Sequence, residues 1–329
     1  MLTKKFNLEE VIAKRNQKQC GFIDLAQKVD SSQVRLPYMI VCGAEDGPVL
    51  LVDCCVHGDE YEGAEAISRI YNQLDPAKMK GTFIGVPAVN LEAFNAGERV
   101  APIDWTHLDM NRAFPGDPEG IITSRVSYFY FENFVKKADF CISFHGGGNG
   151  LYMEPLITYT SPNESEVDIS YRAAAASGLK VWWNLDEAPF AGSLPEEARK
   201  EGVPCSVIEL GGQGVRVDHR DEMISISAEA IENIMKEFDM LEGSYEKVPQ
   251  DEIKNVRIKY VHADDGGYHK LAVKAMDFVK KDQVCSEIVD IFGQKVNEVV
   301  APFDCYIVGF WSYATIHPGN WAFLFGEPV

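Results

Sequence analysis

The sequence has no run of about 20 apolar residues, the length that a membrane-spanning helix needs. Its first residues carry charge but no apolar segment of the kind found in secretory signal peptides. Basic residues are scarce: 31 Lys and Arg stand against 50 Asp and Glu, which gives a net charge of −19. This negative charge opposes binding to nucleic acid or to an anionic membrane surface. We therefore expect a cytoplasmic protein with no nucleic-acid or membrane partner.

The chain has eight cysteines but no C-x-x-C pair, so it supports neither a zinc ribbon nor a thioredoxin-like redox site. Several of them, such as Cys54, Cys55 and Cys141, lie inside apolar runs, where cysteine behaves as a small apolar side chain. The glycine-rich stretch 211–214 lacks the Lys-Ser/Thr of a phosphate-binding loop. Low-complexity segments and repeats of fixed period are also missing. We expect a globular protein with reduced, structural thiols.

With 329 residues the chain exceeds a typical single domain. Strand-like and helix-like segments alternate in the first part, which predicts a mixed α/β sheet with helices on both faces. Short alternating segments with turn signals follow a polar stretch at 242–250, and these predict a small all-β barrel or sandwich. We therefore predict an α/β domain at 1–245 and a β domain at 250–329.

The patterns predict the following elements. Helices are expected at 8–18, from Glu62 onwards, at 123–137, before Gly178, at 195–200 and at 227–241. Strands are expected at 33–42, 49–56, 82–90, 138–144, 179–183 and 204–210, with 35–42 beside 49–56, and in the last part at 256–262, 269–275, 283–292, 295–300, 305–311 and 321–325. Residues 91–120 show no periodicity, and loops of that length inside a domain are usually functional.

His57 and Glu60 stand on the turn between a buried strand and a helix, with Gly58 between them. An imidazole and a carboxylate three residues apart can reach one divalent ion, and nitrogen with oxygen ligands suits zinc. A plain polar loop can contain the same short H-x-x-E pattern, so the motif match alone is only a hypothesis. A metal site therefore needs a further ligand from elsewhere in the chain.

His145 and Glu209 each follow another apolar strand. Sheets of this class bind ligands outside the carboxyl ends of their strands, so these side chains can converge with His57 and Glu60. Two histidines and a glutamate form a catalytic zinc site with a position left for water. A further carboxylate then serves as general base, and we interpret Glu209 as that base. Its alternative interpretation is a carboxylate that faces the rim of the sheet.

Four motifs together resemble the succinylglutamate desuccinylase/aspartoacylase family, a branch of the zinc-carboxypeptidase-like (M14-type) enzymes. They occur in the order of that family, span about residues 49–214, and are followed by a β region that also suits it. The motifs are His57-Gly58-Asp59-Glu60-x-x-Gly63, Leu108-Asp109-Met110-Asn111-Arg112-Ala113-Phe114-Pro115-Gly116, Phe144-His145-Gly146-Gly147 and Ile208-Glu209-Leu210-Gly211-Gly212.

The resemblance implies one Zn²⁺ per chain, bound by His57, Glu60 and His145, with Glu209 as the base. It also implies a zinc-carboxypeptidase-like fold with a trailing β domain. These are the same residues that the strand ends indicate.

The resemblance further implies roles for the long loop. Asn111 and Arg112 would hold the α-carboxylate of an N-acyl amino acid, and arginine offers a bidentate fork for this. Arg99 would match the arginine that steadies the developing oxyanion. Because loop spacing varies, a solvated arginine is the alternative for Arg99. Asp59 is expected to orient a ligand, with a plain turn residue as the alternative.

These observations predict a zinc-dependent amidohydrolase that removes the acyl group from an N-acyl amino acid or a close analogue. A metallocarboxypeptidase acting on short peptides needs the same site and stays open. A non-catalytic metal- or ligand-binding module is a third reading, although a pure binding site would not require Glu209. The sequence names neither the acyl group nor the amino acid. It leaves the native metal and the oligomeric state open, with a homo-oligomer among the alternatives.

Overall fold

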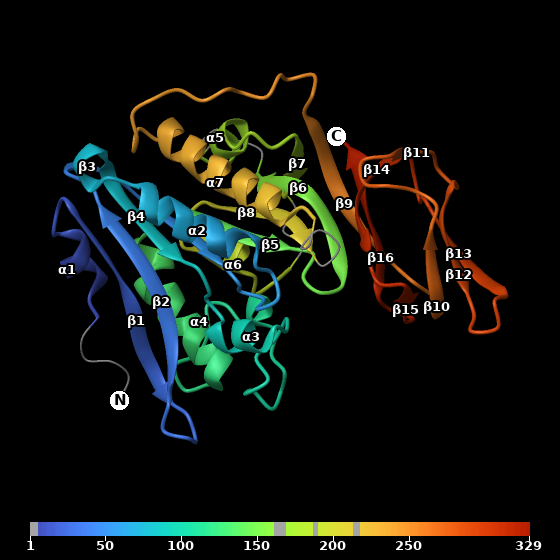
Figure 1. Ribbon diagram of the computed structural model, residues 1–329, viewed down its shortest axis with the longest axis horizontal. Coiled ribbons are helices and arrows are strands. Elements are labelled where there is room, and N and C mark those ends of the chain that lie inside the picture. The colour runs from blue at the N-terminus through green and yellow to red at the C-terminus, as the bar shows by residue number, and fades with distance from the viewer. Residues whose placement is uncertain (1–5, 161–168, 187–189, 213–217) are drawn as a thin grey trace.

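The computed structural model describes residues 6–160, 169–186, 190–212 and 218–329. A large twisted sheet with helices occupies most of the molecule, and the C-terminal strands form a β structure at one end, drawn in orange and red in Figure 1. None of the helices in the described part is long and apolar enough to cross a membrane.

The sheet is mixed, and its centre is parallel. Its strands follow the order β1-β2-β4-β3-β5-β8-β6-β7 and then continue into the C-terminal strands. The neighbours β4, β3, β5 and β8 run parallel, so their carboxyl ends meet at one edge. The bounds are Gln17–Gln27 (β1), Gln33–Cys42 (β2), Glu45–Cys54 (β3), Lys80–Val86 (β4), Phe140–Gly146 (β5), Leu151–Tyr159 (β6), Val181–Asn184 (β7) and Cys205–Gly212 (β8).

Helices cover both faces of the sheet, which confirms the predicted mixed α/β sheet. On β3, Leu50 and Val52 contact one group of helices while Leu51 contacts the other, because successive strand side chains point to opposite faces. Helices α2 and α7 lie side by side on the first face, together with α5 (Figure 1). The first face carries α2 (Glu62–Gln73), α5 (Ile169–Ala176) and α7 (Arg220–Glu237), and the second carries α1 (Leu8–Ile12), α4 (Ile122–Asn133) and α6 (Leu194–Lys200).

The C-terminal β structure shares strands with the main sheet. Strand β9 pairs with β7, β16 pairs with β9, and β14 pairs with both β16 and β6. The ring β6-β7-β9-β16-β14 is therefore closed, and closure leaves no open edge in it. The bounds are Lys254–His262 (β9), Gly267–Leu271 (β10), Phe278–Val279 (β11), Val284–Val289 (β12), Lys295–Val300 (β13), Cys305–Trp311 (β14), Thr315–Ile316 (β15) and Trp321–Pro328 (β16).

This ring refines the predicted C-terminal barrel. A barrel is present, but it has five strands and takes β6 and β7 from the first part of the chain. A second sheet, β13-β12-β10-β15, lies beyond it. The division into 1–245 and 250–329 stays a prediction.

Some expected elements differ in the structure. Residues 35–42 and 49–56 are not neighbours, because β4 lies between β2 and β3. The expected helix at 8–18 ends early, and β1 begins at Gln17. The long segment 91–120 contains α3 (Leu91–Ala96) and a 3₁₀ turn, η2 (Met110–Arg112); two further turns are η1 (Pro76–Lys78) and η3 (Val135–Lys137).

Candidate active site

The turn after β3 holds the first two candidate ligands, His57 and Glu60. A Cβ on Gly58 would lie 2.0 Å from a backbone carbonyl carbon of α3, so the turn packs against α3 as only glycine allows. The thiols of Cys54 and Cys55 both donate to the carbonyl oxygen of Glu60, at 3.1 Å each. Backbone packing and these two hydrogen bonds thus fix the direction of the turn.

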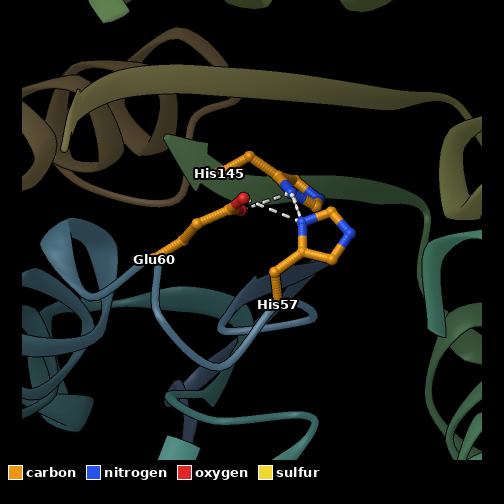
Figure 2. Close-up of side chains that lie close together, drawn as sticks. All are labelled: His57, Glu60 and His145. Carbon is orange, nitrogen blue, oxygen red and sulfur yellow. Dashed lines mark hydrogen bonds and ion pairs between the residues drawn. The ribbon is translucent and has the colours of Figure 1, made fainter. Parts of the chain in front are cut away.

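His145, at the end of β5, completes a buried cluster with the two residues of the turn. Figure 2 shows the three side chains pointing toward one another. Nδ1 of His57 lies 2.9 Å from one carboxylate oxygen of Glu60, and Nδ1 of His145 lies 2.8 Å from the other. The two Nδ1 atoms are 3.2 Å apart. Each of the three residues is at most 4% exposed.

This donor set fits a divalent metal such as zinc. Two imidazole nitrogens and a carboxylate oxygen converge within 4.8 Å of one another, which is the ligand set of catalytic zinc sites. Burial alone would raise the pKa of Glu60, but the charges of His57 and His145 outweigh it and hold that pKa well below its ordinary value. The carboxylate is therefore in the ionised form that metal binding requires.

Asp109 orients one of these histidines, although the sequence assigned it no role. Its Oδ1 lies 3.1 Å from Nε2 of His57, which directs the Nδ1 lone pair toward the cluster when Nε2 carries the proton. Arg99 donates to the other oxygen of Asp109, from Nη2 at 3.1 Å. Asp109 lies inside the second sequence motif, and this position was the one feature of the sequence that could have indicated its role.

Arg99 reaches the same cluster. Its Nη1 lies 3.4 Å from a carboxylate oxygen of Glu60. The backbone N–H of Gly58 donates to the carbonyl oxygen of Arg99 at 3.4 Å, which ties the loop to the turn after β3. The structure therefore brings Arg99 to the site, and its role at the oxyanion stays a prediction.

Asn111 and Arg112 lie in η2 and line the same cavity as the cluster. Oδ1 of Asn111 accepts from the backbone N–H of Leu194 at 2.9 Å, so the side-chain N–H₂ group is the part that can serve a ligand. The guanidinium of Arg112 lies 4.2 Å from the ring centroid of Phe190, and Nη1 donates to the carbonyl oxygen of Asn111 at 2.7 Å. These contacts restrict the orientation of the Asn111 amide group and of the Arg112 guanidinium group.

Glu209 lies on β8 directly beside His145 in the parallel pairing of β5 with β8. Its side chain lines the cavity and is partly exposed there. Burial raises the pKa of Glu209 to about 7, against a smaller opposite effect of His145. A carboxyl group with a pKa near neutrality can both accept and return a proton. Asp59 also lines the cavity and accepts the N–H of Asn149 at 2.8 Å.

The cavity has a volume of about 360 Å³, toward the small end of small-molecule sites. Its aromatic side chains come from β7, β9, β16, the end of β14 and two loop positions, Phe190 before α6 and Tyr313 after β14. Sequence reasoning missed them as cavity residues. Trp182 packs in the core, whereas the neighbouring Trp183 lines the cavity. His219 and Arg220 are exposed and do not line it, and Arg216 lies outside the described residues.

Comparison with known proteins gives relatives with matching architecture. A curated relative, the N-alpha-acetyl-L-2,4-diaminobutyric acid deacetylase of Halomonas elongata, is 28% identical over 281 residues, which are 83% of this chain and 80% of the relative. The product-bound ectoine utilization protein EutE (DoeB) from Ruegeria pomeroyi has a TM-score of 0.85 at 23% identity and covers 95% of this chain and 96% of its own. A succinylglutamate desuccinylase/aspartoacylase from Rhodobacter sphaeroides has a TM-score of 0.84 at 24% identity, with 96% and 97% covered.

The family itself is shown by the sequence. The model of the succinylglutamate desuccinylase/aspartoacylase catalytic domain matches residues 46–238, which is more than half of the chain. That range includes the His57, Glu60 and His145 cluster, the long loop and Glu209. The chain belongs to the succinylglutamate desuccinylase/aspartoacylase family.

Proposed function

We propose that the protein is a zinc-dependent amidohydrolase that removes the acyl group from an N-acyl amino acid. The observation that carries this proposal is the meeting of His57, Glu60 and His145 with Glu209 and Arg112 around one small cavity. The name of the Halomonas relative, a deacetylase of an acetylated amino acid, supports the same reaction class.

In this proposal His57, Glu60 and His145 hold the metal. Zinc there supplies Lewis-acid polarisation of the substrate carbonyl and a water molecule of lowered pKa. Glu209 takes the proton of the attacking water and then gives it to the leaving amine, for which its pKa of about 7 is suited. Arg99, beside Glu60, donates to the carbonyl oxygen as negative charge develops on it.

Arg112 and Asn111 hold the α-carboxylate of the substrate. The guanidinium carbon of Arg112 lies over the ring of Phe190, so the ring restricts where the guanidinium group can lie. Asn111 is fixed by its bond from Leu194 and offers its amide N–H₂ group. With the carboxylate held at one point and the carbonyl at another, the amide bond is placed beside Glu209 and the three residues that would hold the metal.

The size of the cavity favours a deacylase over a metallocarboxypeptidase. A volume of about 360 Å³ suits an amino acid with a short acyl group rather than a peptide that continues beyond the scissile bond. A non-catalytic binding module would gain nothing from Glu209, because partial removal of a carboxyl group from water costs free energy whether or not the group takes part in a reaction.

Two measurements together test the proposal. Elemental analysis of the purified protein should find one zinc per chain, and His145→Ala should lose it. An amine-release assay on N-acetyl amino acids, N-succinyl amino acids and dipeptides should show release from the acyl amino acids. A wild-type protein that takes up no metal when zinc is added would refute the site. Faster release from dipeptides would establish the carboxypeptidase instead.

A further inference from the structure

The cavity is lined by two chemically different sets of side chains. One set is charged or metal-ligating: His57, Glu60, His145, Arg99, Glu209 and Asp59. The other set forms an apolar wall of aliphatic and aromatic side chains, among them Met153, Trp183, Phe190, Tyr260, Trp321 and Leu324. An apolar wall of this extent determines which substrates gain free energy by entering, because apolar groups are stabilised when they leave water.

Part of the apolar wall belongs to the five-stranded barrel. Met153 of β6, Trp183 of β7 and Leu324 of β16 belong to the apolar core inside the ring, where each is at most 6% exposed, and each also lines the cavity. The wall is thus part of a closed hydrogen-bonded ring. A wall of this kind is preformed, and a ligand need not order it.

One ring of the aromatic wall contacts Arg112, the residue proposed to bind the α-carboxylate. The guanidinium of Arg112 stacks on Phe190, whose ring centroid lies 5.8 Å from that of Tyr260. The ring centroid of Tyr260 in turn lies 4.7 Å from that of Trp321 and 6.3 Å from that of Trp183. In an amino acid the side chain and the carboxylate are bonded to the same carbon atom. A substrate held by Arg112 therefore places its side chain beside these rings.

The charged residues of the cavity also favour a substrate with an uncharged side chain. Among the described residues, Arg99 and Arg112 are the only Lys or Arg side chains that line the cavity. Arg99 already faces Asp109 and Glu60, and Arg112 is assigned to the α-carboxylate. A second carboxylate on the substrate would lose water without gaining a cation from the described lining, which is costly. Arg220 pairs with Glu65 on the surface instead.

We propose that the site selects N-acyl amino acids whose side chain is bulky and uncharged, aromatic above all. The inference rests on the proposed deacylase function and names its substrate class. It excludes acidic substrates such as N-acetylaspartate and N-succinylglutamate as preferred ones, although the family is named after enzymes for acidic compounds.

A substrate panel tests the inference with the full-length, zinc-loaded enzyme. The kcat/KM for N-acetyl-phenylalanine, -tryptophan and -leucine should exceed that for N-acetylaspartate, N-succinylglutamate and N-acetyl-2,4-diaminobutyrate by about tenfold or more. A charged substrate as good as these would overturn the selectivity and leave the deacylase intact. Absence of hydrolysis across the panel would overturn the proposed function. In that case calorimetry with free phenylalanine against aspartate still tests the wall, and tighter binding of aspartate would refute it.

A matched pair of tryptophan variants locates the effect. Trp321→Ala removes a ring from the wall and should lower the ratio of kcat/KM on N-acetyl-phenylalanine to that on N-acetylglycine by about tenfold. A loss of folded protein would lower both values equally and leave the ratio unchanged. Trp105→Ala is the control, because Trp105 is 83% exposed and does not line the cavity. An unchanged ratio in a folded Trp321→Ala variant would contradict the inference.

Discussion

At the scale of single residues, Glu209 makes the most direct prediction. Glutamine has nearly the same shape but cannot take a proton, so Glu209→Gln should lower kcat by about 10²-fold or more. The metal content should stay that of the wild type, because Glu209 is not one of the three residues whose ligand atoms converge. Turnover near the wild-type level in a zinc-loaded Glu209→Gln variant would refute the base assignment.

Asp109 is predicted to act through His57. Asp109→Asn keeps the shape but weakens the acceptor that faces Nε2 of His57, so the affinity for zinc should fall by about 10- to 100-fold. Competition with a chelator measures this directly and does not depend on turnover. Asp117→Asn serves as the control, since Asp117 is exposed in the same loop. Equal zinc affinities in the two variants would show that Asp109 does not position His57.

Asp53 predicts a pH dependence of stability. This carboxyl group is fully buried and accepts hydrogen bonds from Tyr130 at 2.6 Å and Ser143 at 2.7 Å. Burial raises its pKa to about 6, above an unfolded value of about 3.9. The folded protein therefore binds a proton that the unfolded chain has lost between about pH 4 and pH 6, and stability falls as the pH rises through that window.

Asp53→Asn should remove this dependence. The difference in unfolding free energy between variant and wild type should shift in favour of the variant by about 2 kcal/mol as the pH rises from 4 to 6, and become level above about pH 7. Denaturant unfolding at several pH values measures it. A difference that does not change with pH would show that Asp53 has an ordinary pKa in the folded protein.

At the scale of elements, the turn between β3 and α2 depends on close packing of backbone. A Cβ on Gly58 would lie within 2.0 to 2.5 Å of backbone atoms of Ala93 and Phe94, which cannot move without displacing α3. Gly58→Ala should therefore destabilise the protein by about 3 kcal/mol or more and disturb the metal cluster. Gly21→Ala is the control, because its Cβ would meet only the side chain of Tyr38, at 3.2 Å. Similar thermal midpoints for both variants would contradict this.

The elements also show what a sequence can predict. Strand β2 has the predicted bounds, Gln33–Cys42, and the strongly apolar β3, β4, β5 and β8 were found, because buried parallel strands have an apolar pattern of their own. Strand β6 was missed because Pro155 argues against a strand. The structure accommodates it at a register shift between Met153 and Leu156.

The candidate site follows the same rule. His57, Glu60, His145 and Glu209 could be located because each stands at the end of a strand that the sequence shows. Tyr260 and the other aromatic residues of the cavity could not, because they enter it through pairings between β9, β16 and β14 that are far from the metal cluster in sequence. Long-range strand pairing leaves no local pattern to read.

At the scale of the whole molecule, the five-stranded ring joins the two parts of the chain. Strand β7 pairs with β9, and β6 pairs with β14. The barrel therefore needs strands from both the first part of the chain and the C-terminal part. The same ring supplies the apolar wall of the cavity. Substrate recognition and the stability of the C-terminal strands are therefore expected to depend on each other.

A chain that ends at residue 249 tests this dependence. It would lack β9 and all later strands, leaving open edges on β6 and β7 and exposing Met153 and Trp183, which are buried in the complete protein. We expect it to aggregate or to show no turnover, because open apolar strand edges pair with other chains. The control is a full-length chain with a short Gly-Ser insertion after Glu246, in an exposed segment where insertions are tolerated. Size-exclusion chromatography and the amine-release assay compare the two, and a monomeric 1–249 chain as active as the control would show that the first part folds and works without the barrel.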